Sequence, residues 1–504
     1  MHRIGLPALP PLVIALCWFL GAGALAAPEP IGATTLTIGI GRDFFNGPEG
    51  QVYVHGSTNT WEGLTRLDDR LTAQPWLAEA WHTPDDGRTW VFRLRTGVRF
   101  HDGSPLTAER AAETLNRLRA HPRFDPNGLF DDVESITAVG ERDLVYRLTA
   151  PVPFFPKAVS YYGSPIVAPE TLTADGRMEG LIGTGPFRLG RIRRGDSLEV
   201  LAFDDYWGGR PAYDRVLFRT ILDADSRLLA LRAGQIDAIV DFGGILPQQA
   251  PDLARVKGVT VKHRELANTH QVQFNCRRGP FAERAWREWF ASRLDRAALV
   301  GVFAPGAGVL ARDPHTRLDP DVAFGCIAPP PPMAPPGETR PADPLILLLH
   351  NGFAGRLPYL EFAQVIQQHL REAGLPTEIR IQEPGAHRRT RLAGDYDLLI
   401  GPTGFLTGDP DHHYANFVAG TAPFSGGCRD PDIEELIATA RHETDPARRR
   451  DQYRRLCEWV ATEWPMIPLY HEVALYAHRE TVADLEMDVI FRPWLDRARP
   501  AAGR

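Results

Sequence analysis

Along most of the chain, short stretches in which apolar and polar residues alternate are interspersed with stretches that have the spacing of an amphipathic helix. Residues 89–95, TWVFRLR, alternate as a half-buried strand does, and turn sequences flank them. Residues 108–119 instead carry apolar side chains at helical spacing, behind a Thr107 side chain that can cap a helix. Three further segments are predicted to contain strands: residues 36–42, 129–150 and 198–221.

The same irregular alternation continues beyond residue 225. Residues 226–237 predict a helix that ends near Gly234, and the strand AIVDF follows it. Residues 280–303 form a long amphipathic helical region. Four more elements follow in the order strand, helix, strand, strand: residues 345–352, 358–374, 376–383 and 396–401. Strands and helices mixed in this way predict an α/β fold with mixed sheets.

One proline-rich segment interrupts the pattern. Residues 326–344, CIAPPPPMAPPGETRPADP, contain too many prolines for a regular helix or sheet and predict a polyproline-like surface connection. The β-α-β-β order after this segment predicts a second α/β lobe. Because 504 residues are more than one core usually organises, two or three domains are expected.

The N-terminus has the pattern of a secretory signal. Basic residues at positions 2–3 precede an apolar run at 12–25, and small residues at Ala24 and Ala26 predict cleavage after Ala26. The alternative is a membrane anchor, but the run is short and contains proline and glycine. Leu16 before Cys17 is too bulky for a lipoprotein site. We therefore expect an exported, soluble protein in the periplasm.

Net charge and cysteine content indicate which partners are not expected and whether disulfides are expected. A net charge of −7 gives no electrostatic reason to expect binding to nucleic acid or to an anionic membrane. Four cysteines remain after the predicted signal, and export favours disulfides among them. Three pairings are possible, and buried free thiols are the alternative. Pairing in sequence order would join the first two and the last two: Cys276, Cys326, Cys428 and Cys457.

Motifs of known enzyme classes are missing from the sequence. It contains no GxSxG elbow, no GxxxxGK phosphate loop and no GxGxxG fingerprint that opens a helix. Residues 442–446 and 471–475 begin like a zinc-protease helix, but neither supplies a second histidine four residues on. Closely spaced cysteine pairs of the zinc type are also missing. We therefore predict a protein that is not an enzyme and requires no resident cofactor.

Two long motifs resemble the family 5 extracellular solute-binding proteins, which serve ABC importers for peptides, nickel chelates and opines. They are GRTWVFRLRTGVRFHDGSPLTAERAAETLNRL, at 87–118, and the stretch that begins IGTGPFRLGRIRRGDSLEV and ends RAGQIDAIVD, at 182–241. Residues 272–300, the GDPD turn at 408–411 and residues 465–477 resemble the family more weakly, in the same order. The resemblance covers roughly residues 35–490.

This resemblance implies a two-lobed periplasmic-binding-protein fold. After a signal peptide at 1–26, lobe 1 would span 27–268 with an extra subdomain at about 66–168, lobe 2 would span 269–475, and 476–504 would return to lobe 1. The protein would be a monomer that captures a small ligand as the lobes close and delivers it to an ABC permease and its ATPase. A ligand sensor that is not coupled to transport, and an exported hydrolase with a cryptic site, are the rival functions.

The resemblance also implies which residues line the cleft. Nickel-type members hold a metal chelate through one or two protein histidines, so His412, His413, His471 and His55 are the candidate metal ligands. At most one of the adjacent pair should face the cleft, because neighbouring side chains diverge. The full set of predicted ligand-binding residues is His55, Trp61, Arg123, Tyr161, Tyr162, His270, Phe405, Asp411, His412, His413, Tyr414 and His471.

A peptide ligand is the main alternative. Dipeptide-binding relatives place an aspartate shortly before GDPD for the ligand's ammonium group, whereas residues 404–407 here contain no acid. Asp409 or Asp411 would have to substitute, although both side chains can simply shape the turn. We therefore favour a nickel or other metal chelate as the transported ligand over a peptide, with opines or sugars as further possibilities.

Overall fold

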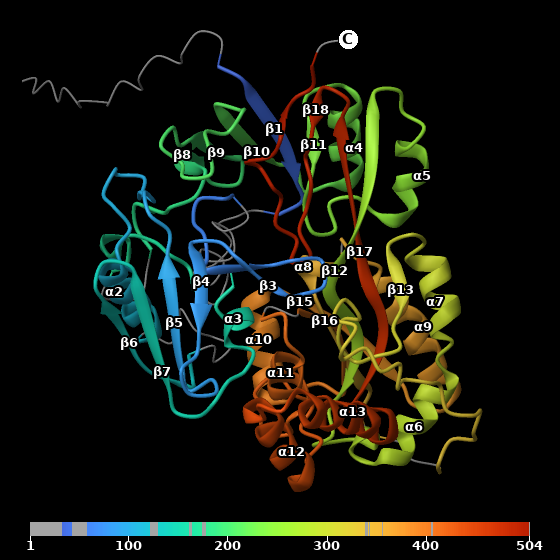
Figure 1. Cartoon of the computed structure of the whole chain (residues 1–504). Helices are drawn as coiled ribbons and strands as arrows, with labels where there is room; N and C mark the ends of the chain where they lie inside the picture. The colour runs from blue at the N-terminus through green and yellow to red at the C-terminus, as the bar shows by residue number, and fades with distance from the viewer. Residues whose placement is uncertain are drawn as a thin grey trace, which may run out of the picture. The chain divides into compact units, whose positions relative to one another are not determined.

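The largest element of the structure is an eleven-stranded mixed sheet (Figure 1). The structure is a computed structural model and describes residues 33–42, 58–120, 130–160, 164–173, 178–337, 341, 343–354, 356–404 and 407–502. The strand order is β15-β14-β16-β12-β17-β11-β1-β10-β9-β8, with β13 on β17. These strands are β1 (Thr35–Ile40), β8 (Phe187–Arg193), β9 (Ser197–Ala202), β10 (Arg215–Thr220), β11 (Ala238–Ile239), β12 (Val259–Phe274), β13 (Gly308–Leu310), β14 (Leu345–His350), β15 (Thr377–Gln382), β16 (Leu398–Gly404) and β17 (Met466–Arg479).

Two long antiparallel strands, β12 and β17, join the two halves of this sheet. One end of the pair carries β11, which is parallel to β1, and the other end carries β16, which is parallel to β14. Register shifts near His270 bend the ladder midway along its length. Figure 1 shows β12 and β17 running side by side between the two halves. The pair is therefore the part of the sheet that connects the two halves.

A smaller antiparallel sheet has its own core. It contains β4 (Ala78–His82), β5 (Thr89–Leu94), β7 (Asp143–Leu148) and β6 (Val133–Val139), and α2 (Ala108–Arg119) covers it. Phe92, Tyr146 and Leu115 are fully buried between the sheet and the helix. The Thr107 side chain accepts a hydrogen bond from the backbone of Arg110, so the predicted helix start is confirmed.

Helices cover the halves of the large sheet and continue toward the C-terminus. They are α3 (Phe155–Ala158), α4 (Ala224–Arg232), α5 (Ala250–Leu253), α6 (Arg284–Arg293), α7 (Arg296–Phe303), α8 (Asn351–Ala354), α9 (Tyr359–Glu372), α10 (Pro384–Ala393), α11 (Pro410–His413), α12 (Pro431–His442) and α13 (Pro446–Glu463). Short pairs complete the set: β2 (Thr65–Leu67) with β3 (Ala73–Pro75), and β18 (Val482–Ala483) with β19 (Arg499–Pro500). Among the described residues, no helix is long and apolar enough to cross a membrane.

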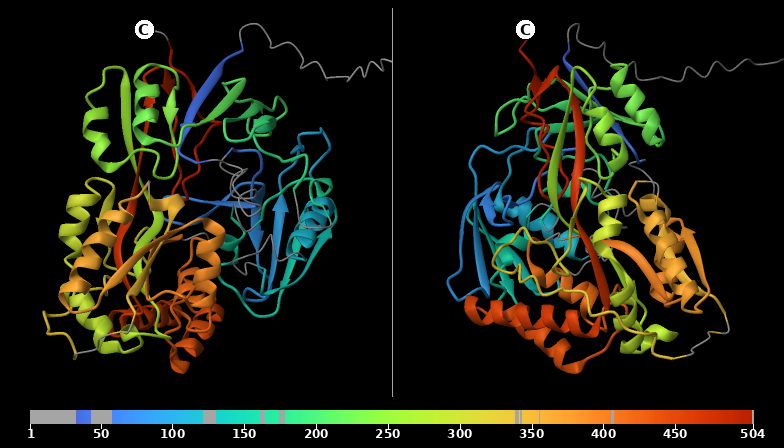
Figure 2. Two further views of the ribbon diagram at one scale, coloured as in Figure 1. Left: turned by 180° about the vertical axis from the view of Figure 1, so that it is seen from behind. Right: turned by 90° about the vertical axis from the view of Figure 1, so that its right-hand side faces the viewer.

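The amphipathic region at 280–303 is broken into two helices. Between α6 and α7, the Asp295 side chain accepts a hydrogen bond from the backbone of Ala298 and begins a new helix. The proline-rich segment behaves as its composition predicts, because its described residues adopt no regular helix or strand. Figure 2 shows from two further sides how the small sheet and the C-terminal helices lie beside each other.

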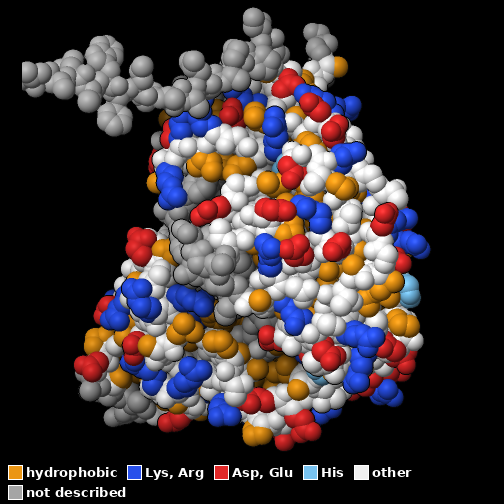
Figure 3. All heavy atoms as spheres, turned by 90° about the vertical axis from the view of Figure 1, so that its left-hand side faces the viewer, with side chains coloured by type: hydrophobic (Ala, Val, Ile, Leu, Met, Phe, Trp, Pro, Cys, Tyr) orange, Lys and Arg blue, Asp and Glu red, His pale blue; other side chains and the backbone are white. Residues whose placement is uncertain are grey.

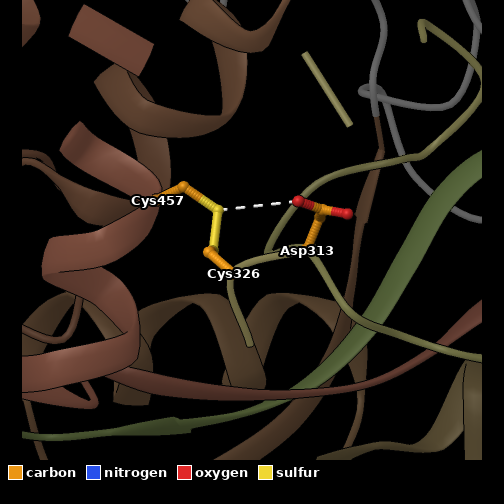
Figure 4. A group of neighbouring side chains, drawn as sticks. All are labelled: Asp313, Cys326 and Cys457. Carbon is orange, nitrogen blue, oxygen red and sulfur yellow. Dashed lines mark hydrogen bonds between the residues drawn. A yellow bond between two sulfur atoms is a disulfide. The ribbon is translucent and has the colours of Figure 1, made fainter. Parts of the chain in front are cut away.

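The four cysteines form two disulfides, but not in sequence order. Cys276 pairs with Cys428 and Cys326 with Cys457, so the pairing of nearest cysteines along the chain is wrong. The reason is tertiary: the Cys326 segment packs on α13, which carries Cys457. Figure 4 shows Asp313 beside this second disulfide, with its Oδ1 atom 3.6 Å from the Cys457 sulfur. The same Oδ1 accepts hydrogen bonds from the backbone of Phe324 and Gly325, which closes the intervening loop.

Two aromatic residues of the second family-like motif donate hydrogen bonds to a buried carboxyl group. Tyr206 donates a 2.8 Å hydrogen bond to Glu62, and the indole of Trp207 donates one of 3.0 Å. Burial raises the pKa of Glu62 to about 7, even though both hydrogen bonds favour its ionised form. Tyr206 and Trp207 therefore do more than pack: they hold an acid next to the predicted cleft residue Trp61.

We expect Glu62→Gln to flatten the pH dependence of stability between pH 4.5 and 7. In this interval the folded protein keeps a proton on Glu62 that the unfolded chain has lost, so stability falls as the pH rises. The shift from 4.5 to about 7 corresponds to about 3 kcal/mol. Urea unfolding at pH 4.5 and pH 8 measures the difference, with Glu170→Gln as an exposed control. An unchanged difference in Glu62→Gln would contradict the assignment.

Candidate functional site

Helix α11 begins at the GDPD turn, and both aspartates of this turn form ion pairs with arginines. Asp409 caps the helix by accepting a 3.0 Å hydrogen bond from the backbone of Asp411, and it forms a two-pronged ion pair of 2.7 and 3.1 Å with Arg449. Asp411 is ion-paired with Arg441. Both carboxylates are buried and already paired with an arginine, and of their four oxygens only Oδ1 of Asp411 has no hydrogen-bond partner among the described residues.

The adjacent histidines of α11 point to different surroundings, as the sequence predicts for neighbours. His412 lines a small cavity together with Asp132 and Phe154. The ring of His413 lies 6.1 Å from the ring of His315, and the rings of both His412 and His413 contact Phe417. The cavity beside His412 has a volume of about 30 Å³, which holds one or two waters and no solute ligand.

Three buried histidines in this region are neutral at pH 7. Burial lowers the pKa of His412 to about 4 and that of His471 to about 3, and it also lowers the pKa of His413 well below 6.5. Among the described residues, the Nε2 atoms of His413 and His471 have no hydrogen-bond partner. A neutral imidazole with an uncommitted nitrogen is a good ligand for a divalent transition metal.

His315 belongs to the same group and was missed by sequence reasoning. Its Nε2 donates a 3.1 Å hydrogen bond to the carbonyl oxygen of Val322, which fixes the tautomer with a lone pair on Nδ1. The residue is buried, and burial lowers its pKa. It lies in the irregular segment before the proline-rich stretch, and neither periodicity nor the family-like motifs point to it. Only its proximity to His413 in space identifies it.

The described residues do not contain a preformed cluster of histidines at metal-ligand spacing. Only Asp313, Cys326 and Cys457 bring three potential donor atoms within 4.8 Å of one another in the described part of the chain. Two of these residues are joined in a disulfide, whose sulfurs are not thiolates, so this group is not a metal site (Figure 4).

His270 lies on β12 within the β12–β17 ladder, where neighbouring side chains hold its ring. Its Nδ1 lies 2.6 Å from the Tyr359 hydroxyl and its Nε2 lies 3.0 Å from Glu472, while its ring stacks on Tyr470 at 4.2 Å. Glu472 also accepts a 2.7 Å hydrogen bond from Asn268. Since both ring nitrogens are occupied and the residue is fully buried, this arrangement argues against the expected ligand contact.

The remaining predicted residues divide into two groups. Trp61 and Tyr414 are fully buried within the hydrophobic cores, and the Tyr414 ring packs on Tyr453 at 5.6 Å. The other predicted residues lie outside the described part of the chain: His55, Arg123, Tyr161, Tyr162 and Phe405.

A separate group of charged side chains lies at the carboxyl ends of β1 and β11. The Asp241 carboxylate forms an ion pair with Arg42, whose Nε lies 2.9 Å from its Oδ1, and a second one with Arg356, whose Nη2 lies 3.5 Å from its Oδ2. Arg227 lies close to Asp241 and Arg356. Burial alone would raise the pKa of Asp241, but the arginines and the backbone of Gly41 hold it below its usual value. Two guanidinium groups thus share one carboxylate at the carboxyl ends of parallel strands, where α/β sheets commonly bind ligands, while Arg227 donates to backbone carbonyl oxygens nearby.

Arg356 is the member of this group with spare hydrogen-bonding capacity. Its side chain is 12% exposed, and burial lowers its pKa to about 10, so it stays charged at pH 7. Its Nε has no hydrogen-bond partner among the described residues. A buried cation with an uncommitted donor favours a ligand that carries a carboxylate. Nothing in the sequence motifs pointed to Arg356.

The face of the molecule shown in Figure 3 has no large area of a single charge among its described residues. On the face shown in Figure 3, the Lys and Arg side chains and the Asp and Glu side chains of the described residues are interspersed. An interspersed pattern gives no large field of one sign to attract nucleic acid or an anionic membrane.

Comparisons with known proteins agree with this architecture. The family model of the bacterial extracellular solute-binding proteins, family 5 Middle, matches residues 72–323. Di/tripeptide-binding protein 4 of Pseudomonas aeruginosa (strain UCBPP-PA14) is 28% identical over 81% of this chain and 83% of its own length. The nickel-binding periplasmic protein of Escherichia coli (strain K12) is 25% identical over 81% of this chain and 83% of its own length.

A solved structure gives the same fold. NikA from Staphylococcus aureus in complex with Ni(L-His)2 superposes with a TM-score of 0.77 at 18% sequence identity, covering 93% of this chain and all of that chain. The expected two-lobed periplasmic-binding-protein fold is therefore confirmed. The relatives' names cover both peptides and nickel, so similarity alone does not choose between these ligands.

Proposed function

This chain belongs to the family 5 extracellular solute-binding proteins of bacteria, and we propose that it captures a carboxylate-bearing metal chelate for an ABC importer. The ligand would lie between lobes formed by residues 27–268 and 269–475, with 476–504 returning to the first lobe. A signal peptide at 1–26 would direct the protein to the periplasm. The closed form would then present the ligand to a permease driven by an ATPase.

The observation that carries the chelate proposal is the pair of uncommitted imidazole nitrogens on His413 and His471. Both imidazoles are neutral, buried and lack a partner at Nε2 among the described residues. One or two such nitrogens complete the coordination of a metal that already carries a chelator. His315 is a third candidate, because it is buried and its ring lies 6.1 Å from that of His413.

The arginines around Asp241 would bind the acidic part of the same ligand. Chelators of nickel carry carboxylates, and Arg356 supplies a charged, partly uncommitted guanidinium for them. A ligand that contacts the histidines on one side and Arg356 on the other would favour the closed state by its own contacts. No metal resident in the protein is needed, because the metal is cargo.

A peptide is the second candidate, supported by the di/tripeptide-binding relative. Arg356 would suit a peptide's terminal carboxylate equally well. The ammonium group, however, would need an available acid, and both Asp409 and Asp411 are already paired with arginines. We therefore place the chelate first.

Calorimetric titration with a nickel–histidine complex and with dialanine distinguishes the two ligands. We expect saturable binding of the nickel complex and weaker or no binding of dialanine. His413→Gln and His471→Gln should each weaken nickel-complex binding, whereas His263→Gln, an exposed histidine on β12, should not. Tight binding of dialanine that both histidine variants leave unchanged would overturn the chelate proposal in favour of a peptide.

A further inference from the structure

We propose that Arg441 is a closure latch, which ties the small four-stranded sheet to the C-terminal helices and sets how often the ligand-free protein is closed. The inference rests on the proposed function only in that the protein binds its ligand by closing two lobes. It concerns residues that need not touch the ligand.

The latch is an ion-paired triad. The Arg441 Nε donates a 2.6 Å hydrogen bond to Asp132, which immediately precedes β6 of the small sheet. Nη1 of the same guanidinium donates to Asp411 on α11. The side chains are mostly buried, with exposed fractions of 23% for Arg441, 16% for Asp132 and 3% for Asp411. One guanidinium therefore bridges acids that are far apart in the sequence.

The two acids repel each other without Arg441. Asp132 lies close enough to Asp411 for its charge to disfavour the ionised form of Asp411. When the two parts separate, Arg441 and Asp411 stay together, since they lie on neighbouring elements near the C-terminus, whereas Asp132 leaves with the small sheet. The Arg441–Asp132 contact is thus the member of the triad that exists only while the parts are together.

Further contacts lie around the triad: two join the segment after β7 to the C-terminal helices, and one joins α3 to the loop before the proline-rich segment. His442 Nδ1 donates a 2.9 Å hydrogen bond to the carbonyl oxygen of Pro151, and the Arg449 guanidinium lies 4.9 Å from the Phe154 ring centre. Lys157 forms a 2.9 Å ion pair with Asp319. The cavity that Asp132, Asp411 and Arg441 line together has a volume of about 30 Å³, so the described side chains of the two parts lie close together here.

Such a contact changes ligand affinity without touching the ligand. Closing a binding protein costs free energy unless protein contacts offset it, and the apparent dissociation constant scales inversely with the competent fraction. Loss of the cross-contact should therefore open the ligand-free protein and weaken binding of any ligand by about threefold to tenfold.

Asp132→Asn is the sharpest test, because it removes the negative charge from the cross-contact and leaves Arg441 paired with Asp411. Its control is Asp131→Asn, the same change at the exposed neighbouring residue. We would measure the ligand-free proteins by small-angle scattering and by hydrogen–deuterium exchange over residues 152–158 and 436–442. We expect a larger radius of gyration and about tenfold faster exchange in Asp132→Asn, with Asp131→Asn unchanged.

A scattering curve and exchange rates for Asp132→Asn that match the wild type would overturn the latch. If the variant does not fold, wild-type exchange in 1 M KCl provides the test, since salt weakens partly exposed ion pairs. Faster exchange in both segments at high salt would then support the latch, and no change would overturn it. These measurements contain no ligand, so a failure of the chelate proposal would leave their outcome unaffected.

Discussion

Replacing Arg356 by glutamine should lower affinity for a carboxylate ligand by about a hundredfold or more and leave the fold intact. Arg356 is buried, charged at pH 7, and carries a nitrogen donor without a partner among the described residues. Loss of a buried charge-assisted contact to a ligand costs about 2–5 kcal/mol. The variant should still fold, because Asp241 keeps its ion pair with Arg42 and the nearby charge of Arg227.

The measurement is titration of Arg356→Gln with the nickel–histidine complex and with dialanine, alongside thermal unfolding. Arg380→Gln is the matched control, since Arg380 is paired locally with Glu378 on the same strand, β15. An affinity close to that of the wild type for every ligand that the wild type binds would show that Arg356 is structural. A collapse of the unfolding temperature would show the same.

Removing the Cys326–Cys457 disulfide should lower the free energy of unfolding by about 3–5 kcal/mol. The bond closes a loop with a sequence separation of 131 residues, and closing a loop of this length restricts the unfolded chain strongly. The double variant Cys326→Ser/Cys457→Ser avoids leaving a free thiol. It should also weaken ligand binding, because this disulfide anchors the loop that carries His315 and Asp319.

Urea unfolding measures the stability, and titration with the nickel–histidine complex measures the affinity. Cys276→Ser/Cys428→Ser is the control, since that disulfide spans a similar sequence separation of 152 residues. Both double variants should lose similar stability, and the Cys326–Cys457 variant should lose more affinity. Equal affinity in the two variants would contradict a role of the anchored loop in the site.

Local patterns were sufficient for the fold class and for part of the elements, but they predicted neither the long strands β12 and β17 nor the helices α10, α12 and α13. Alternation predicted β5, helical spacing with Thr107 predicted α2, and the two long motifs led to the family and hence to two lobes. These features depend on residues close together in the sequence. The helix break at Asp295 was missed because the apolar spacing continues through it, although the aspartate is itself a capping residue.

Contacts between distant segments could not be predicted from such patterns. The disulfide pairing depends on how the loop before the proline-rich segment packs on α13. The family resemblance predicted that His270 lines the cleft. In the structure, its Nδ1 lies at hydrogen-bond distance from Tyr359 and its Nε2 from Glu472. Arg356 and His315 follow no motif and become candidates only because the fold places Asp241 and His413 beside them. Site chemistry therefore emerged from tertiary neighbours.

Native mass spectrometry with metal analysis, on protein isolated from the periplasm of a cell that expresses the full chain, tests the central claim most directly. We expect a bound small molecule that contains nickel or another transition metal, present at about one per chain. The metal should be depleted in His413→Gln and retained in His263→Gln. A bound peptide without metal, or a catalytic product released from any offered ligand, would contradict the account.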